Sequence, residues 1–303
     1  MIGFIGGSGI YEALPLDNVR EVEIDTPYGE PSAPVTVGEF GDGETSETSR
    51  NGDGEAAEGG TEVAFLPRHG PEHGRDPTNL PYRANIYALK ELGVERVLAS
   101  NAVGSLKEEL EPGTLVVPDG TFDRTKHRDS TFFGDGIVVH MPFADAYCPH
   151  MASHLAESAE EATDADVSEG GTYVCIEGPQ YSTRAESEFY KSQGWDVVGM
   201  TAIPEAKLAR EAEMCYATLA GVTDYDVWKR DSEVTLEEVL ENAAKNETAI
   251  KQAVEHAIET LPEERDCDCE HALDGTINTP VDAIPQETRE RVDPLVGHYL
   301  DDA

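Results

Sequence analysis

Residues 215–228 read CYATLAGVTDYDVW, an apolar run that ends in two carboxylates. The run from Cys215 to Val222 has the length and composition of a buried strand in a parallel sheet. Open α/β sheets bind ligands outside the carboxyl ends of their strands, which is where Asp224 and Asp226 lie. A carboxylate at such an edge can accept a hydrogen bond from an amino group or give a proton to a ring nitrogen. An isolated Asp-x-Asp is more often part of a loop or a helix cap, so other segments must point to the same site.

The segments around this strand alternate between strands and helices, which predicts an α/β fold with a central mixed β-sheet surrounded by helices. Strands are expected at Met1–Ile5, Val35–Phe40, Glu62–Pro67, Arg96–Ser100, Leu115–Pro118, Tyr173–Ile176 and Asp196–Gly199. Helices are expected at Tyr82–Leu92, Arg184–Gln193, Pro204–Glu213, Thr235–Leu261 and Gln286–His298. We expect a single domain over residues 1–262 and an extension, residues 263–303, that packs on or near it.

The chain is strongly acidic, with 61 Asp and Glu against 22 Lys and Arg among 303 residues and a formal net charge of −39. A nucleic-acid or anionic membrane surface attracts basic patches, so neither is expected as a partner. Apolar segments persist between the acidic ones, which indicates a folded core under an acidic surface and favours a protein adapted to concentrated salt. The acidic segment Gly41–Gly60 is interpreted as an extended hairpin loop, mobile and dispensable for catalysis. The chain has no apolar stretch long enough to span a membrane and no basic leader, so we expect a cytoplasmic protein.

The five cysteines fall into two groups. Cys148, Cys175 and Cys215 lie in or beside apolar segments and are expected to be buried thiols. Cys267 and Cys269 form Cys-Asp-Cys, whose spacing is shorter than that of the usual zinc motifs. A local disulfide or two free thiols are therefore preferred to a metal site, and no metal is expected.

Glycine-rich or polar turns are expected at five strand ends, and their order resembles that of the purine nucleoside phosphorylase superfamily, specifically the methylthioadenosine phosphorylases. The resemblance runs from Ile2 to about Ala243. The motifs that carry it are GGSG at 6–9, RHG at 68–70, NAVGSL at 101–106, EGPQYSTRAE at 177–186, GMTAIPE at 199–205 and TDYDVW at 223–228. The resemblance implies a nucleoside phosphorylase fold and the phosphorolysis of a purine nucleoside by orthophosphate, with no metal or organic cofactor.

Phosphate binding is implied for one group of residues that supply positive charge, hydroxyls or backbone N–H groups. These residues are Gly7, Ser8, Arg68, His69, Asn101, Ala102 and Thr201. Arg68 is the candidate for bidentate binding. Outside the resemblance, Arg68 could equally form an ion pair and His69 could cap a strand end.

Purine and ribose contacts are implied for a second group. Asp224, protonated or sharing a proton, would hydrogen-bond N7 of the purine, and Asp226 would accept from the 6-amino group or hold Asp224 in place. Two nearby carboxylates raise each other's proton affinity, which would help one of them act as an acid. Ser182 would contact the base, Tyr181 would stack on it, and Met200 would pack beneath the ribose.

Two further features bear on the substrate. Relatives that act on 6-oxopurines tend to carry Asn at the position of Asp224, so Asp favours adenine. Leu236 and Val239 would line an apolar pocket for a 5′-methylthio group, although both could also simply lie on the side of a long helix that faces the protein core. An adenosine phosphorylase, a 6-oxopurine phosphorylase and a non-catalytic nucleoside-binding protein stay open as alternatives.

His140 resembles a residue that a neighbouring subunit contributes to the 5′ pocket. The resemblance therefore implies shared active sites in a homotrimer or a dimer of trimers. A single His in an apolar segment is otherwise more often a satisfied core residue.

Overall fold

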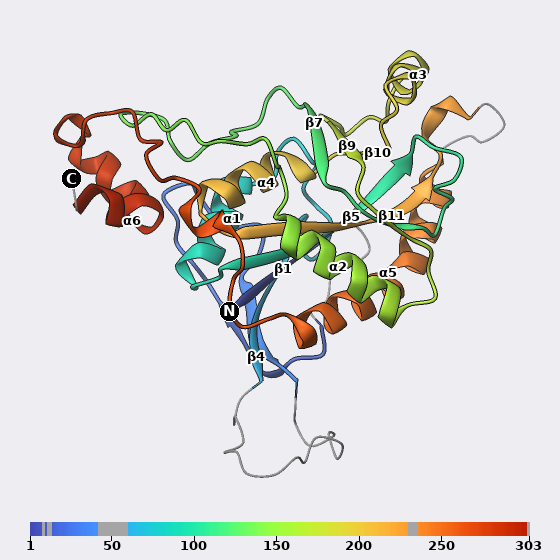
Figure 1. Ribbon diagram of the computed structural model, residues 1–303, viewed down its shortest axis with the longest axis horizontal. Coiled ribbons are helices and arrows are strands. Elements are labelled where there is room, and N and C mark those ends of the chain that lie inside the picture. Colours follow the sequence, from blue (N-terminus) through green and yellow to red (C-terminus); the bar gives the residue numbers. More distant parts are fainter. Residues whose placement is uncertain (8–9, 11–13, 42–59, 230–234, 302–303) are drawn as a thin grey trace, which may run out of the picture.

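The computed structural model describes residues 1–7, 10, 14–41, 60–229 and 235–301. Within these residues, eleven strands form one mixed sheet, and helices cover both of its faces (Figure 1). The α/β prediction is therefore confirmed. Ser8 and most of the acidic loop, residues 42–59, lie outside the described residues.

The elements follow one another along the chain as strands interspersed with single helices. The strands are β1 (Ile2–Gly6), β2 (Asp17–Val22), β3 (Val35–Phe40), β4 (Thr61–Pro67), β5 (Arg96–Ser105), β6 (Leu115–Val117), β7 (Gly120–Arg124), β8 (Val167–Glu169), β9 (Thr172–Ile176), β10 (Val197–Gly199) and β11 (Cys215–Asp224). The helices are α1 (Tyr82–Glu91), α2 (Pro149–Ala162), α3 (Arg184–Ser192), α4 (Ala202–Glu211), α5 (Leu236–Thr260) and α6 (Gln286–Asp301). The sequence analysis did not assign β2, β7, β8 or α2.

Strand β5 is the centre of the sheet because it pairs with three others. Its first residues pair in parallel with β1, β11 pairs in parallel with it from Arg96 to Gly104, and its last residues pair antiparallel with β10. The prediction of a turn at Asn101–Ser105 was therefore wrong: these residues continue the strand. They can do so because β11 and β10 take up their backbone hydrogen bonds, which satisfies polar groups that would otherwise favour a turn.

The pleat of β11 distributes its side chains between two cores. Tyr216, Ala220 and Val222 pack in the core that α1 and α4 cover, whereas Ala217 and Leu219 pack in the core beneath α2 and α5. Figure 1 shows these two helix pairs on opposite sides of β1, β5 and β11. Because both faces are buried, the strand is apolar along almost its whole length, as the sequence predicted.

The chain after α5 returns along the body of the protein. The guanidinium of Arg96 donates to the carbonyls of Pro262 and Glu263, and Leu273 and residues of α6 belong to the core on the α1 side. Among the described residues, no helix has both the length and the apolar character required to cross a membrane.

Candidate active site

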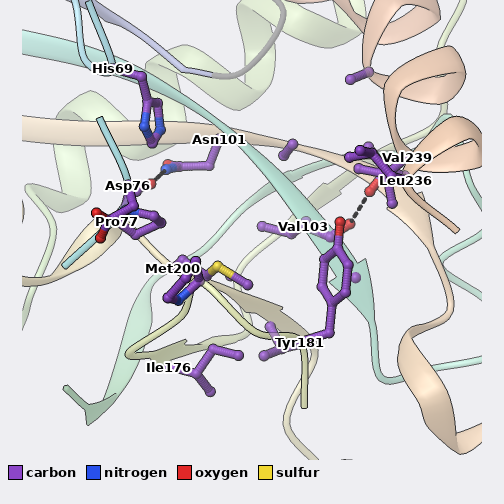
Figure 2. A pocket seen from close by; sticks show the side chains of 18 of the residues that line it. His69, Asp76, Pro77, Asn101, Val103, Ile176, Tyr181, Met200, Leu236 and Val239 are labelled. Atoms are coloured by element: carbon purple, nitrogen blue, oxygen red, sulfur yellow. Dashed lines mark hydrogen bonds between the residues drawn. The ribbon is translucent and has the colours of Figure 1, made fainter. Parts of the chain in front are cut away.

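A cavity of about 460 Å³ opens where β4, β5, β10 and β11 end. The ends of these strands converge because they are neighbours in one sheet, and the first turns of α5 close the opposite wall. Figure 2 shows His69 and Asn101 toward one end of the cavity and Leu236 and Val239 toward the other. The predicted site residues that line it are Arg68, His69, Asn101, Ala102, Tyr181, Ser182, Met200, Thr201, Asp224, Asp226, Leu236 and Val239.

Arg68 is fully buried at one end of the cavity and is held by Glu205. Its Nε and Nη2 donate to the two carboxylate oxygens of Glu205, each at 2.7 Å, and its Nη1 donates to the carbonyl of Ser100 at 2.7 Å. Burial lowers the pKa of Arg68, but the charge and hydrogen bonds of Glu205 outweigh burial and raise it above the usual value. Glu205 also accepts a hydrogen bond from the Tyr216 hydroxyl at 2.8 Å.

This ion pair changes what Arg68 can offer an anion. A guanidinium carries five N–H groups, and the described contacts use three of them. Arg68 was predicted to bind phosphate through two N–H groups, but its Nε–Nη2 side, which could do so, is occupied by Glu205. Only the remaining N–H groups of Nη1 and Nη2 can face the cavity.

His69 lies beside Arg68 and stacks on His73, with ring centroids 4.4 Å apart and planes 5° from parallel. Its Nδ1 lies 2.8 Å from the carbonyl of Arg75, which can only accept, so Nδ1 carries the proton. Burial lowers the pKa of His69 to about 4, against the opposing effect of that hydrogen bond. At neutral pH the ring therefore offers an acceptor at Nε2, not the donor that the sequence suggested.

Thr201 and Asn101 complete this end of the cavity. The Asn101 amide donates to Thr201 Oγ1 at 2.6 Å and its carbonyl oxygen accepts from the Thr218 hydroxyl, so the amide orientation is fixed from both sides. Because Thr201 Oγ1 accepts from Asn101, its own proton is directed elsewhere. Thr201 directly precedes α4, but the backbone of Ile203 is not helical, with φ −118° and ψ 130°, and its N–H donates to Cys175 Sγ, so a regular helix terminus does not point at this end of the cavity.

Gly7 lies behind Arg68 and does not line the cavity. Its N–H donates to the Ser100 hydroxyl at 2.9 Å. A Cβ atom at Gly7 would come within 2.3 Å of the Ser100 carbonyl oxygen and 2.9 Å of Arg68 Nη1. The glycine is therefore required so that the turn after β1 can approach the guanidinium closely.

Arg128 supports the middle of the cavity from behind. Its buried guanidinium donates to the carbonyls of Met200 and Ile203, each at 2.6 Å, and it pairs with Glu177. It thereby ties the loop after β9 to the turn between β10 and α4. Met200, which the sequence could also have placed in the plain core, is half-buried and lines the cavity.

Asp224 ends β11 at the other side of the cavity with both carboxyl oxygens engaged. Oδ1 accepts from the backbone N–H of Asp226 and Oδ2 accepts from the Thr223 hydroxyl, both at 2.7 Å. These two hydrogen bonds come from residues next to Asp224 in the chain, and they hold its carboxyl where it lines the cavity.

Asp226 differs from Asp224 because its Oδ2 atom is buried without a hydrogen-bond partner among the described residues. The hydroxyl oxygens of Ser182 and Ser187 are buried and unpartnered in the same way. Burial raises the pKa of Asp226, and the two nearby hydroxyls act against it. The negative charge of Glu186 also contributes to the raised pKa of Asp226. Buried polar atoms without partners are costly, and since Ser182 and Ser187 are close enough to the Asp226 carboxyl to lower its pKa, these groups can complete their hydrogen bonds with one another or with a ligand.

The backbone of Asp226 is also strained, since its φ of 49° lies in the left-handed region. This conformation lets the chain turn back on itself directly after β11. Gly104 on β5 permits the turn, because a Cβ atom there would lie 3.0 Å from Asp224 Oδ1 and 3.3 Å from Asp226 Cβ. The two carboxylates thus depend on a glycine of a neighbouring strand.

An apolar wall faces Met200 across the cavity. It consists of Leu236, Val239, Leu240 and Ala243 on the first turns of α5. Leu236 is 64% exposed, so it does not face the protein core, which was the alternative interpretation of this position. Tyr181, 41% exposed, lies between this wall and the base of the cavity (Figure 2).

Besides Gly7, two predicted residues are not placed in the cavity. His140 is exposed on the segment whose backbone pairs with Thr276 and Asn278, and it does not line this cavity. Ser8 lies outside the described residues.

Sequence reasoning missed Glu205, Arg128 and His73. Glu205 ends the GMTAIPE motif, but its partner Arg68 is 137 residues away, so no local spacing pairs them. Arg128 lies in a segment for which no element was predicted. His73 follows the RHG motif by three residues, and a second His so close to His69 was the signal that could have found it.

Comparison with known proteins gives a consistent result. The sequence model of the phosphorylase superfamily matches residues 1–259. The S-methyl-5′-thioadenosine phosphorylase of Koribacter versatilis is 45% identical over 300 residues, which cover 99% of this chain and 96% of the relative.

Solved structures agree with the sequence match. A methylthioadenosine phosphorylase from an antarctic soil metagenomic library superposes with a TM-score of 0.86 at 44% identity and covers 97% of this chain and 98% of that one. A mutant of the adenosine/methylthioadenosine phosphorylase from Schistosoma mansoni, in complex with methylthioadenosine, gives a TM-score of 0.75 at 34% identity over 89% and 94% of the two chains. This chain belongs to the phosphorylase superfamily and, within it, to the family of the S-methyl-5′-thioadenosine phosphorylases.

Proposed function

We propose that this chain catalyses the phosphorolysis of 5′-methylthioadenosine to adenine and 5-methylthioribose 1-phosphate. The observation that carries the proposal is that the two ends of one cavity present different chemical groups. Arg68 and Thr201 lie at one end, and an Asp226 carboxyl oxygen and the Ser182 hydroxyl, which have no hydrogen-bond partner among the described residues, lie at the other. An anion and a purine can therefore approach the sugar between them from opposite sides.

Phosphate binds at the first end. The remaining N–H groups of Arg68 and the Thr201 hydroxyl donate to its oxygens. Nε2 of neutral His69 accepts a hydrogen bond from a phosphate oxygen that carries a proton. The Arg68–Glu205 pair is neutral as a unit, so it holds phosphate by oriented donors more than by net charge. Orthophosphate is a co-substrate, and no metal or organic cofactor is required.

The purine binds at the second end. The unpartnered Oδ2 of Asp226 accepts from the 6-amino group, and Ser182 supplies a further contact. A phosphate oxygen bonds to C1′ while the C1′–N9 bond breaks and its electron pair passes to the purine. Asp224 relieves the developing charge at N7 by giving it a proton. To act in this way, Asp224 must carry a proton in the substrate complex.

The substituent at the 5′ position lies against Leu236, Val239 and Leu240. An apolar wall leaves a 5′-hydroxyl without a partner and accommodates a methylthio group, which favours methylthioadenosine over adenosine. The relatives named S-methyl-5′-thioadenosine phosphorylase support this order. The Schistosoma relative, described as acting on both nucleosides, makes adenosine the second candidate substrate.

The active unit is a homotrimer or a dimer of trimers. In this proposal His140 reaches the 5′ side of a neighbouring subunit's cavity, which accounts for its exposure here and its distance from the cavity of its own chain. The net charge of −39 supports a cytoplasm rich in salt as the working environment, since screening weakens repulsion within and between subunits.

A chromatographic assay of base release tests the proposal. The purified protein, in concentrated potassium chloride, is incubated with methylthioadenosine, adenosine or inosine, each with and without phosphate. We expect phosphate-dependent adenine release that is fastest from methylthioadenosine. Base release without phosphate would make the protein a hydrolase and remove the role of Arg68. Predominant hypoxanthine release would overturn the roles of Asp224 and Asp226.

A further inference from the structure

Four of the five cysteines gather far from the cavity. Cys148 is the N-cap of α2, Cys215 begins β11, and Cys267 and Cys269 flank the start of the short helix η2 (Asp268–His271). Their four Sγ atoms all lie within 4.8 Å of one another. Cys148, Cys215 and Cys269 are buried and Cys267 is partly buried, and all four are free thiols.

The separations suit four ligands around one ion. A tetrahedral zinc site with Zn–S bonds of about 2.3 Å places its sulfurs about 3.8 Å apart. Cys215 Sγ and Cys267 Sγ are 3.4 Å apart, well beyond the roughly 2 Å of a disulfide bond. The cluster therefore needs only small side-chain adjustments to close around a metal.

The sequence obscured this site because its ligands come from three elements. The Cys-Asp-Cys spacing is too short for a zinc knuckle, but that rule applies only when one turn supplies two ligands of a compact motif. Here the pair meets Cys148 and Cys215, which lie 119 and 52 residues before Cys267. His271, close to the pair in sequence, is exposed beside Glu270 and Asp274 and does not belong to the cluster.

The charges around the cluster suit thiolates. A zinc ion with four thiolates carries two net negative charges. Arg265 interacts electrostatically with Cys215 and Arg210 with Cys269, in a chain where basic residues are scarce. The N-terminus of α2 adds a positive dipole end at Cys148.

We propose that Cys148, Cys215, Cys267 and Cys269 bind one Zn²⁺ in a closed structural site. Binding releases the four thiol protons and leaves no open coordination position, so the metal takes no part in the reaction. The ion joins the segment after α5 to β11 and α2 and so fastens the C-terminal part of the chain. Cys215 and Asp224 are the two ends of β11, which separates the metal from the catalytic carboxylate by about 30 Å at roughly 3.3 Å per residue.

The test begins with the wild-type chain, purified anaerobically with reduced thiols, loaded with Zn²⁺ and passed through a desalting column in potassium chloride. We expect about one zinc per chain, and the charge-transfer and visible bands of tetrahedral thiolate coordination when Co²⁺ replaces zinc. A chelator should lower the unfolding temperature of the loaded protein. The initial rate of base release, measured at a temperature where both forms are folded, should stay the same.

Two variants make the test specific. Cys269→Ser should lose zinc retention and the response of its unfolding temperature to chelator, whereas Cys175→Ala, which alters the one cysteine outside the cluster, should retain about one zinc. If Cys269→Ser does not fold, metal retention and the cobalt spectrum of the wild type decide alone. Fully reduced wild-type protein that retains no zinc would overturn the proposal. Alkylation and mass analysis that found the four cysteines joined as disulfides in the freshly isolated protein would overturn it as well.

Discussion

The substitution Glu205→Gln tests whether the buried partner of Arg68 holds it ready for phosphate. The glutamate is 1% exposed and Arg68 is 0% exposed, and two hydrogen bonds of 2.7 Å join them. Gln removes the charge that balances Arg68 and turns an NH₂ group toward one of the guanidinium nitrogens. Breaking a buried ion pair at one partner costs about 3–5 kcal/mol, because the other charge stays buried and unpaired.

Two measurements follow from this change. In urea, the free energy of unfolding should fall by about 3–5 kcal/mol relative to the wild type. In the base-release assay, kcat/KM for phosphate should fall about 10²-fold, since a donor displaced by about 1 Å loses that much.

A matched control lies on the same helix. Glu211 is also buried, but its carboxylate accepts from the Thr131 hydroxyl and the Phe132 N–H and pairs with no arginine among the described residues. Glu211→Gln should leave kcat/KM for phosphate nearly unchanged. If Glu205→Gln keeps both its stability and its phosphate kinetics, Arg68 does not depend on Glu205 and the description of the anion end is wrong.

Three further predictions address the base, the 5′ side and the pH dependence. Asp224→Asn should reduce adenine release from methylthioadenosine by about 10²–10⁴-fold and favour inosine, and unchanged turnover of adenine nucleosides would refute its role. Val239→Thr, similar in shape but with a hydroxyl, should raise the ratio of kcat/KM for adenosine to that for methylthioadenosine by about 10-fold, and an unchanged ratio would remove Val239 from the 5′ pocket. Burial raises the pKa of Glu211 to about 7, against hydrogen bonds that lower it, so the folded state holds this proton more tightly than the unfolded state. Its stabilising effect is complete below about pH 4.5 and is lost by about pH 7, so between pH 8 and 4.5 the wild type should gain about 3 kcal/mol relative to Glu211→Gln in urea unfolding, and equal gains would contradict the raised pKa.

The sequence predicted the main elements because their patterns are local. The run at Cys215–Val222 has Thr218 as its only strongly polar residue, which suits a strand buried on both faces, and it forms most of β11. The polar residues that follow β4 and β11 reach one cavity because parallel strands of one sheet end at a common edge, whereas β10, antiparallel to β5, reaches it from the opposite direction. Asp224, Thr201 and Arg68 could therefore be named from their places after predicted strands.

Other features could not be predicted because they depend on contacts between distant segments. The continuation of β5 through Asn101–Ser105 is stabilised by β10 and β11, which lie about a hundred residues further along the chain. The predicted bidentate face of Arg68 is occupied by Glu205, and the expected donor His69 offers an acceptor because of the Arg75 carbonyl.

The sequence by itself determined the fold class, the strand ends that form the cavity and the residue types that suit phosphate and adenine, because periodicity and motif order are properties of neighbouring residues. Only the tertiary structure decided which atoms remain available. Hydrogen bonds from Thr223 and Asp226 occupy both oxygens of Asp224, whereas Oδ2 of Asp226 is left unpartnered. It also brought Cys267 and Cys269 to Cys148 and Cys215. The cysteine cluster and the Arg68–Glu205 pair depend on packing between segments that are 52 and 137 residues apart, and such contacts are decided by distances in space and not along the chain.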